Sequence, residues 1–183
     1  SGDRDKVVLD GAQSRHGEVV GITACSGVTI ADLTIQNIKW NGFKLNSDKG
    51  VQRVTICNCV IHNIWQRGIK GVAVPEENRE QVRPKDCRVQ HCLFYNDHPK
   101  RYEDDPTDTP ETFGGNYIGG MDIMYATNWT ISDNVVYDND TGFHSQSYHS
   151  DNTFANNLVY DNRGRGLLLE AVQTSNGTLS LTN

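Results

Sequence analysis

Short apolar–polar alternations repeat along most of this chain. The clearest block spans residues 28–37, and its pattern recurs at 54–63, 87–96, 129–138 and 152–161. Each copy holds two short alternating stretches rich in β-branched residues, which predicts two strands rather than a helix. A polar residue separates the two stretches, usually Asn or Asp, which tolerate left-handed backbone angles. We therefore expect a kink at each of Asp32, Asn58, His91, Asp133 and Asn156.

A second block, led by glycine, follows each copy. It begins at Gly42, Gly68, Gly120, Gly142 and Gly166, and residues 19–22 supply an earlier strand of this kind. Each repeat therefore contributes three strands, and each coil buries its apolar face only against its neighbours. The sequence predicts an all-β fold, a right-handed parallel β-helix of about six coils and three parallel sheets. We expect one domain over residues 1–183, either whole or a fragment of a longer β-helix, because residues 178–183 begin a further copy.

The alternation also predicts which side chains share a column. Leu33, Cys59, Cys92, Asn134 and Asn157 are expected to point inward together. Asn134 and Asn157 would then form a buried ladder of side-chain amides, which is tolerable only if the amides are bonded. Cys59 and Cys92 would lie about 5 Å apart, as a stack of apolar thiols or as a disulfide. An outward stack is expected on another face from Tyr95, Tyr137 and Tyr160.

Spacing between coils is uneven, and the extra residues fall in two segments. The kink-to-kink interval is 26 residues, then 33, 42 and 23. The additions lie at 72–86 and 97–119, are polar and contain all five prolines, so both are predicted to be loops. They flank the glycine-led sheet from opposite edges. Together they would form the walls of a groove, since long loops on a rigid scaffold usually carry function.

The outward column of the glycine-led sheet carries the candidate chemistry. It reads Lys44, Lys70, Asp122, His144 and Leu168. The position two residues on contributes Gln146 and Glu170, among others, and the turns before the strands contribute Arg67, Arg165, Trp40 and Trp65. Lysines directly opposite one another are unfavourable, so the pairing of the two lysines suggests an anionic ligand.

The five block copies and the glycine-led strands resemble the pectin-lyase-like superfamily of right-handed parallel β-helices. The resemblance covers nearly the whole chain. It implies binding of an extended polysaccharide along the glycine-led sheet, and a secreted protein in the extracellular or periplasmic space. The superfamily holds lyases, hydrolases, epimerases and non-catalytic proteins, so the resemblance speaks for the fold rather than for one activity.

An acidic polysaccharide is the expected partner, and a lyase or uronate epimerase the expected activity. Both reactions need a base at the carbon next to the carboxylate, and positive charge to stabilise the enolate. The candidate catalytic residues are Lys70, as charge or base, His144 as the alternative base or acid, Asp122 to orient either, and Lys44. The candidate substrate-binding residues are Arg67, Trp40, Trp65, Gln146, Arg165, Glu170, His98 and Tyr102.

Two alternatives stay open. The first is a non-catalytic β-helix that serves as a surface, structural or carbohydrate-binding protein. The second is a glycoside hydrolase, for which Asp122 and Glu170, about 10 Å apart over two coils, are slightly far apart even for an inverting pair. Stacking end to end with another β-helix is also expected, because the strand edges at the end of a stack are unpaired.

Composition narrows the remaining classes. The net charge of −6 argues against a nucleic-acid surface, and no apolar run is long enough for a membrane span. The chain opens Ser1-Gly2-Asp3, so no signal peptide is visible in it. Five cysteines without a C-x-x-C pair predict neither a disulfide framework nor a metal knuckle. Calcium is a candidate cofactor in the acidic run Glu103, Asp104, Asp105, Asp108 and Glu111.

Overall fold

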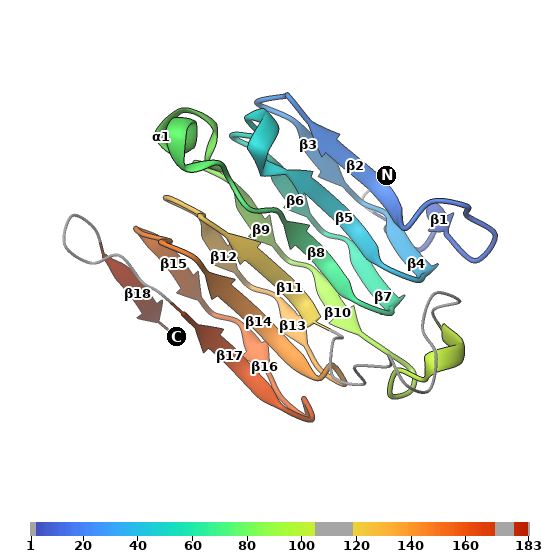
Figure 1. Cartoon of the computed structure of the whole chain (residues 1–183). Helices are drawn as coiled ribbons and strands as arrows, with labels where there is room; N and C mark the ends of the chain where they lie inside the picture. Colours follow the sequence, from blue (N-terminus) through green and yellow to red (C-terminus); the bar gives the residue numbers. More distant parts are fainter. Residues whose placement is uncertain (1–2, 105–118, 171–177, 183) are drawn as a thin grey trace.

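The computed structural model describes residues 3–104, 119–170 and 178–182. Its strands form three parallel six-stranded sheets. Successive coils of one solenoid lie side by side, and each coil contributes a strand to each sheet (Figure 1). Sheet A holds β1 (Val8–Asp10), β4 (Thr34–Ile38), β7 (Val60–Ile64), β10 (Leu93–Tyr95), β13 (Val135–Val136) and β16 (Leu158–Val159). Sheet B holds β2 (Glu18–Thr23), β5 (Asn41–Asn46), β8 (Arg67–Gly71), β11 (Gly119–Met124), β14 (Thr141–Gln146) and β17 (Arg165–Leu169). Sheet C holds β3 (Thr29–Ala31), β6 (Thr55–Cys57), β9 (Arg88–Gln90), β12 (Thr130–Ser132), β15 (Asn152–Ala155) and β18 (Leu179–Thr182).

The predicted repeat is confirmed strand by strand. Each block copy supplies one strand of sheet C and one of sheet A, and each glycine-led block supplies one of sheet B. The five predicted kink residues all have left-handed backbone angles, with φ between 48° and 60°. The Asn58 amide donates to the Asp32 carboxylate at 2.7 Å, so the kinks are also bonded from coil to coil.

A glycine is required near the start of the sheet B strands for a steric reason. A Cβ placed on Gly42 would lie 2.7 Å from the Gly68 carbonyl oxygen of the next coil. The same overlap with the next glycine's carbonyl recurs at Gly68, Gly120 and Gly142. The backbone of each coil therefore packs directly on the next at this corner, and only glycine leaves room for it.

The inward column agrees with its prediction. Cys59, Cys92 and Asn134 are fully buried, and Asn134 donates to Asn157 at 2.9 Å and to the Val89 carbonyl at 3.0 Å. The cysteines are free thiols, so of the two alternatives the thiol stack is the one formed. A second amide ladder, which the sequence analysis missed, joins Asn96, Asn139 and Asn162 at the corner between sheets A and B.

The aromatic stack on the outside of sheet A is also confirmed. The Tyr95 and Tyr137 ring centroids are 5.3 Å apart, and those of Tyr137 and Tyr160 are 5.2 Å apart. His62 extends the stack, with its ring 4.8 Å from that of Tyr95. The stacked rings give this face a structural role, because the ring of each coil covers the ring of the coil before it.

The described parts of the two insertions lie at opposite ends of the sheet B strands (Figure 1). The segment 72–86 follows β8 and contains two short helices, η2 (Glu76–Asn78) and α1 (Arg79–Val82), where only loop was predicted. The other insertion begins after β10 and includes η3 (Tyr102–Asp104). A fourth short helix, η1 (Ser47–Lys49), follows β5 beside α1.

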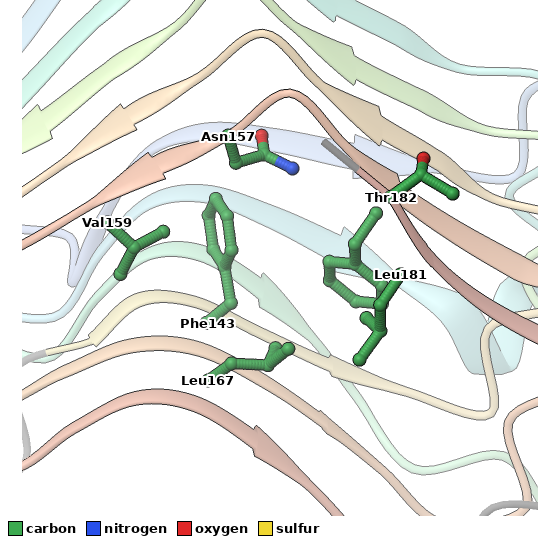
Figure 2. Close-up of a pocket in the computed structure, with 7 residues that line it drawn as sticks. Phe143, Asn157, Val159, Leu167, Leu181 and Thr182 are labelled. Carbon is green, nitrogen blue, oxygen red and sulfur yellow. The ribbon is translucent and has the colours of Figure 1, made fainter.

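The apolar core is open at the last described coil. A pocket of about 340 Å³ lies there, between the final strands of the three sheets (Figure 2). Leu167 and Leu181 project into it and are 36% and 56% exposed, whereas Phe143 behind them is buried. End-to-end stacking at such a face stays a prediction.

Candidate functional site

The outward column of sheet B has the predicted register. Lys44 pairs with Lys70, Lys70 with Asp122, Asp122 with His144, and His144 with Leu168. Arg67 and Arg165, which were expected in turns, are instead the first residues of their strands. Four consecutive coils therefore present ionisable side chains in one line across the sheet.

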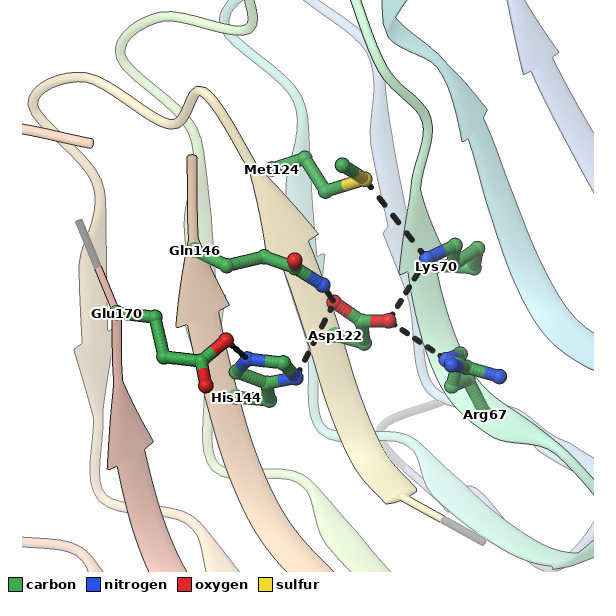
Figure 3. Close-up of polar contacts among 7 residues, drawn as sticks. All are labelled: Arg67, Lys70, Asp122, Met124, His144, Gln146 and Glu170. Atoms are coloured by element: carbon green, nitrogen blue, oxygen red, sulfur yellow. Dashed lines mark hydrogen bonds and ion pairs between the residues drawn. The ribbon is translucent and has the colours of Figure 1, made fainter. Parts of the chain in front are cut away.

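Asp122 is the centre of this line (Figure 3). Although it points outward, it is only 2% exposed. Its Oδ2 atom accepts hydrogen bonds from Arg67 Nε and Lys70 Nζ, both at 2.7 Å, and its Oδ1 atom accepts one from Gln146 Nε2 at 2.8 Å. One carboxylate thus binds two cations and an amide, and its orientation is fixed from both neighbouring strands.

These contacts set the charge states of the cluster. Burial alone would raise the pKa of the Asp122 carboxyl, but Lys70, Gln146 and Arg67 outweigh it and hold that pKa below its ordinary value. Burial lowers the pKa of Lys70, and Asp122 offsets only part of this effect. Burial likewise lowers the pKa of Arg67 to about 10. Asp122 is therefore a firm anion, and burial favours the neutral form of both of its cationic partners.

His144 lies between two carboxylates. Its Nδ1 atom is 3.7 Å from Asp122 Oδ1, and its Nε2 atom is 2.9 Å from Glu170 Oε2. The side chains of His144 and Lys70 are about equally accessible, 20% and 19%, whereas that of Glu170 is 53% exposed. The two titratable groups next to Asp122 therefore reach the surface, while Asp122 itself does not.

The unrelieved repulsion predicted between Lys44 and Lys70 does not arise in this structure. Lys44 Nζ turns to Glu18 Oε1 at 3.4 Å, and Lys70 Nζ turns to Asp122. Each ammonium thus has a carboxylate of the chain itself, which offsets the repulsion that an anionic ligand was expected to offset. Glu18 was missed as a member of the cluster, although its place in residues 18–23 puts it on the strand next to Lys44.

The remaining candidates occupy other positions. Arg67 is buried under its bond to Asp122, whereas Arg165 is exposed at the start of β17. Trp65 is 8% exposed and stacks on His98, with ring centroids 4.6 Å apart. Tyr102 is exposed in η3.

The two tryptophans belong to the corner between sheets A and B. Trp65 lines a pocket of about 340 Å³ there, together with Ile38, Lys39 and Asp104. Trp40 fills the space above Gly17, where a Cβ would overlap its ring. This corner is distinct from the Asp122 cluster, so the structure does not gather all of the predicted site residues in one place.

A basic and aromatic cluster lies at the carboxyl-terminal ends of the sheet B strands, and it was not predicted from the sequence. Arg83 is buried and bonds the carbonyls of Tyr125 and Tyr148, and Arg79 lies against both rings. From the sequence alone, Tyr125 and Tyr148 are predicted only as aromatic residues that could stack on sugars, with no position in the fold. Tyr125 directly follows β11 and Tyr148 lies two residues beyond β14, and this placement was the signal that would have brought them together.

Within residues 3–104, 119–170 and 178–182, no group of three or more His, Cys, Asp or Glu side chains is arranged to hold a metal ion. The calcium hypothesis concerned an acidic run of which Asp105, Asp108 and Glu111 lie outside the described residues. Asp104 accepts the Arg101 backbone N–H at 2.6 Å. In the same described ranges, no helix is both long and apolar enough to cross a membrane.

The stacked parallel coils and the polar line across sheet B define a parallel β-helix protein. Comparison with protein families agrees: the family described as right handed beta helix region matches residues 18–183. The match covers most of the chain, so the chain belongs to this family. No curated protein matches it.

Proposed function

We propose that this protein binds an acidic polysaccharide along sheet B and acts on it as a uronate lyase or epimerase. The observation that carries the proposal is the pair of surface-reaching groups, Lys70 and His144, on either side of one buried, ionised Asp122. A cation and a base held side by side are the two groups that removal of a proton next to a carboxylate requires.

Each residue has a distinct role in the proposal. Lys70, as an ammonium ion beside Asp122, neutralises the substrate carboxylate and stabilises the enolate. His144 accepts the proton at Nε2 after the half-exposed Glu170 releases that atom, and Asp122 Oδ1, 3.7 Å from Nδ1, faces the imidazolium that results. Lys70 is the alternative base, because burial lowers its pKa.

Two outcomes follow from the same enolate. In a lyase, its electron pair forms a carbon–carbon double bond, the neighbouring glycosidic C–O bond breaks, and the departing oxygen takes a proton. In an epimerase, the enolate takes a proton on the opposite face and the chain stays intact. The proposed substrate is an extracellular polysaccharide, so secretion is part of the proposal.

A glycoside hydrolase is less well supported. Inverting and retaining hydrolases both need a carboxylic acid with a raised pKa to protonate the leaving oxygen. The pKa of Asp122 is lowered instead, and both of its oxygens already accept hydrogen bonds.

A non-catalytic carbohydrate-binding or structural protein is the second candidate. It is favoured by the internal pairing of the line: Glu18 with Lys44, Asp122 with Lys70, and Glu170 with His144. A set of mutually paired charges also describes a face that only stabilises the stack.

Turnover separates the two candidates. The protein is incubated with alginate, pectate and glycosaminoglycans while the absorbance of the unsaturated product is followed, and deuterium uptake from heavy water reports epimerisation. His144→Asn and Lys70→Ala are expected to abolish the signal, whereas Lys49→Ala, an exposed lysine on η1, retains it. Polymer binding without product or exchange on any substrate would favour the non-catalytic protein and contradict the enzyme.

A further inference from the structure

The carboxyl-terminal ends of β11 and β14 carry a strained tyrosine pair. Tyr125 and Tyr148 both have φ of 56°, and Ser147 beside them has φ of 62°. A bulky residue in this region is an outlier that costs free energy, and such outliers cluster at ligand sites. The two rings are roughly parallel, with an interplanar angle of 21° and centroids 6.3 Å apart.

The insertion 72–86 holds this pair in place. Arg83 is 4% exposed and donates from Nε to the Tyr125 carbonyl at 3.1 Å, and from Nη2 to the Tyr148 carbonyl at 2.7 Å. Its Nη1 atom also donates to Glu80 at 2.9 Å. One buried guanidinium thus ties two neighbouring coils to the loop and fixes both strained residues.

Arg83 bonds the Glu80 carboxylate, whereas Arg79 has no carboxylate partner among the described residues. Its guanidinium carbon lies 4.9 Å from the Tyr125 ring centroid and 5.1 Å from that of Tyr148. No ion pair or hydrogen bond of its side chain is found with any residue that the structure describes, and its Nε atom is buried without a partner. Stacking on the rings orients the cation, and its hydrogen-bonding capacity is left for a ligand.

This cluster adjoins the candidate site. Tyr125 directly follows β11 and is three residues beyond Asp122, about 10 Å at the usual strand rise. Met124 stands between them, and its sulfur is 3.9 Å from Lys70 Nζ. Tyr148 is 52% exposed, so an aromatic surface is available beside the cation.

We infer that Arg79, Tyr125 and Tyr148 form a second carboxylate-binding subsite. It binds a different uronate unit of the polymer from the unit bound at Lys70 and His144. Arg79 donates two parallel hydrogen bonds to the sugar carboxylate, a geometry that guanidinium favours. The exposed face of Tyr148 stacks on the sugar ring. The inference rests on the proposed function for its ligand class, but it concerns binding and specificity rather than proton transfer.

The test compares oligouronates with their methyl esters, which keep the sugar rings and lose the charge. Calorimetric titration of wild type, Arg79→Ala, Arg79→Lys and Arg88→Ala is the measurement; Arg88 is an exposed arginine on sheet C and serves as the control. Arg79→Ala is expected to weaken binding of the free acid about tenfold and that of the ester hardly at all. Arg79→Lys should also lose most of the preference for the acid, since an ammonium cannot form the bidentate pair.

Kinetics separate this inference from the proposed function. If the protein turns over its polymer, Arg79→Ala should raise KM with kcat nearly unchanged, whereas His144→Asn lowers kcat. Binding of the acid that depends on Arg79 without any turnover leaves the subsite standing and removes the enzyme. Equal affinities for acid and ester, equal affinities of wild type and Arg79→Ala, or no binding of oligouronates by the wild type would each overturn the subsite. Circular dichroism of Arg79→Lys, which keeps the charge and most of the side-chain length, checks that the loop still folds.

Discussion

Lys70 Nζ and Asp122 Oδ2 lie 2.7 Å apart on adjacent coils, although 52 residues separate them in the chain. The carboxylate is buried and Arg67 approaches the same oxygen from beside the lysine. This arrangement makes Asp122 as much a structural residue as a candidate catalytic one, and the two roles can be measured separately.

Replacement of Asp122 by Asn should destabilise the fold. Asn keeps the size of the side chain but leaves the buried charge of Arg67, and that of Lys70, without an anion, at a cost of about 3 kcal/mol. Urea unfolding followed by circular dichroism measures the loss. Asp3→Asn, which removes an exposed ion pair with Lys6, should change the free energy of unfolding by under about 0.5 kcal/mol. Similar stabilities of the two variants would contradict the buried network.

The same carboxylate should make stability depend on acid. The folded pKa of Asp122 is below its ordinary value of 3.8, so the unfolded chain binds more protons between the two values. Its stabilising contribution is therefore complete above about pH 5 and is lost as the pH falls through the folded pKa. Unfolding free energies of wild type and Asp122→Asn, measured from pH 2 to 6, should converge toward the acid end. A constant difference across this range would show that Asp122 does not titrate as inferred.

The amide ladder should tolerate truncation poorly. Asn134→Ala leaves the Cys92 N–H and the Val89 carbonyl without their partner, and opens a cavity in the core. We expect a loss of about 3 kcal/mol. Asn46→Ala, which removes an amide on the outer face, should cost under about 0.5 kcal/mol. Thermal melting of both variants checks the difference, and equal melting temperatures would count against the ladder.

The glycine corner gives a contrast within one sheet. Gly42→Ala forces its Cβ against the Gly68 carbonyl, whereas Gly21→Ala on the neighbouring strand meets no atom within 4 Å. We expect Gly42→Ala to destabilise by about 2 kcal/mol, and Gly21→Ala to be neutral or slightly stabilising. Chemical denaturation of the pair is the test, and an order of stability opposite to this one would refute the close coil-to-coil packing.

The fold could be predicted because each coil repeats a local rule. Alternation fixes which side chains point inward, and the polar residue at each kink fixes where the strand turns, so the column from Lys44 to Leu168 follows from sequence alone. What those side chains contact does not follow. Alternation placed Asp122 outside, but Arg67, Gln146 and the adjacent coils bury it. Lys44 was placed over Lys70, but the rotamers turn the two ammonium groups to different carboxylates.

The insertions were also only half predictable. Proline and polar residues identified 72–86 as a loop, and the sheet B edge it follows was correct. Its short helix α1 and the contacts of Arg79 and Arg83 could not be foreseen, because they depend on the carbonyls and rings of Tyr125 and Tyr148, which lie more than 40 residues away. Tertiary partners of this kind leave no local pattern in the sequence.

In this solenoid, the distance between neighbouring coils does not depend on the number of residues between them. The interval from His91 to Asp133 is 42 residues, and that from Asp133 to Asn156 is 23, yet each step moves the backbone by one strand spacing, about 4.8 Å. A segment inserted between two coils therefore leaves every column in register. Loops between coils can therefore be exchanged one at a time, while the residues of sheet B keep their order and their spacing.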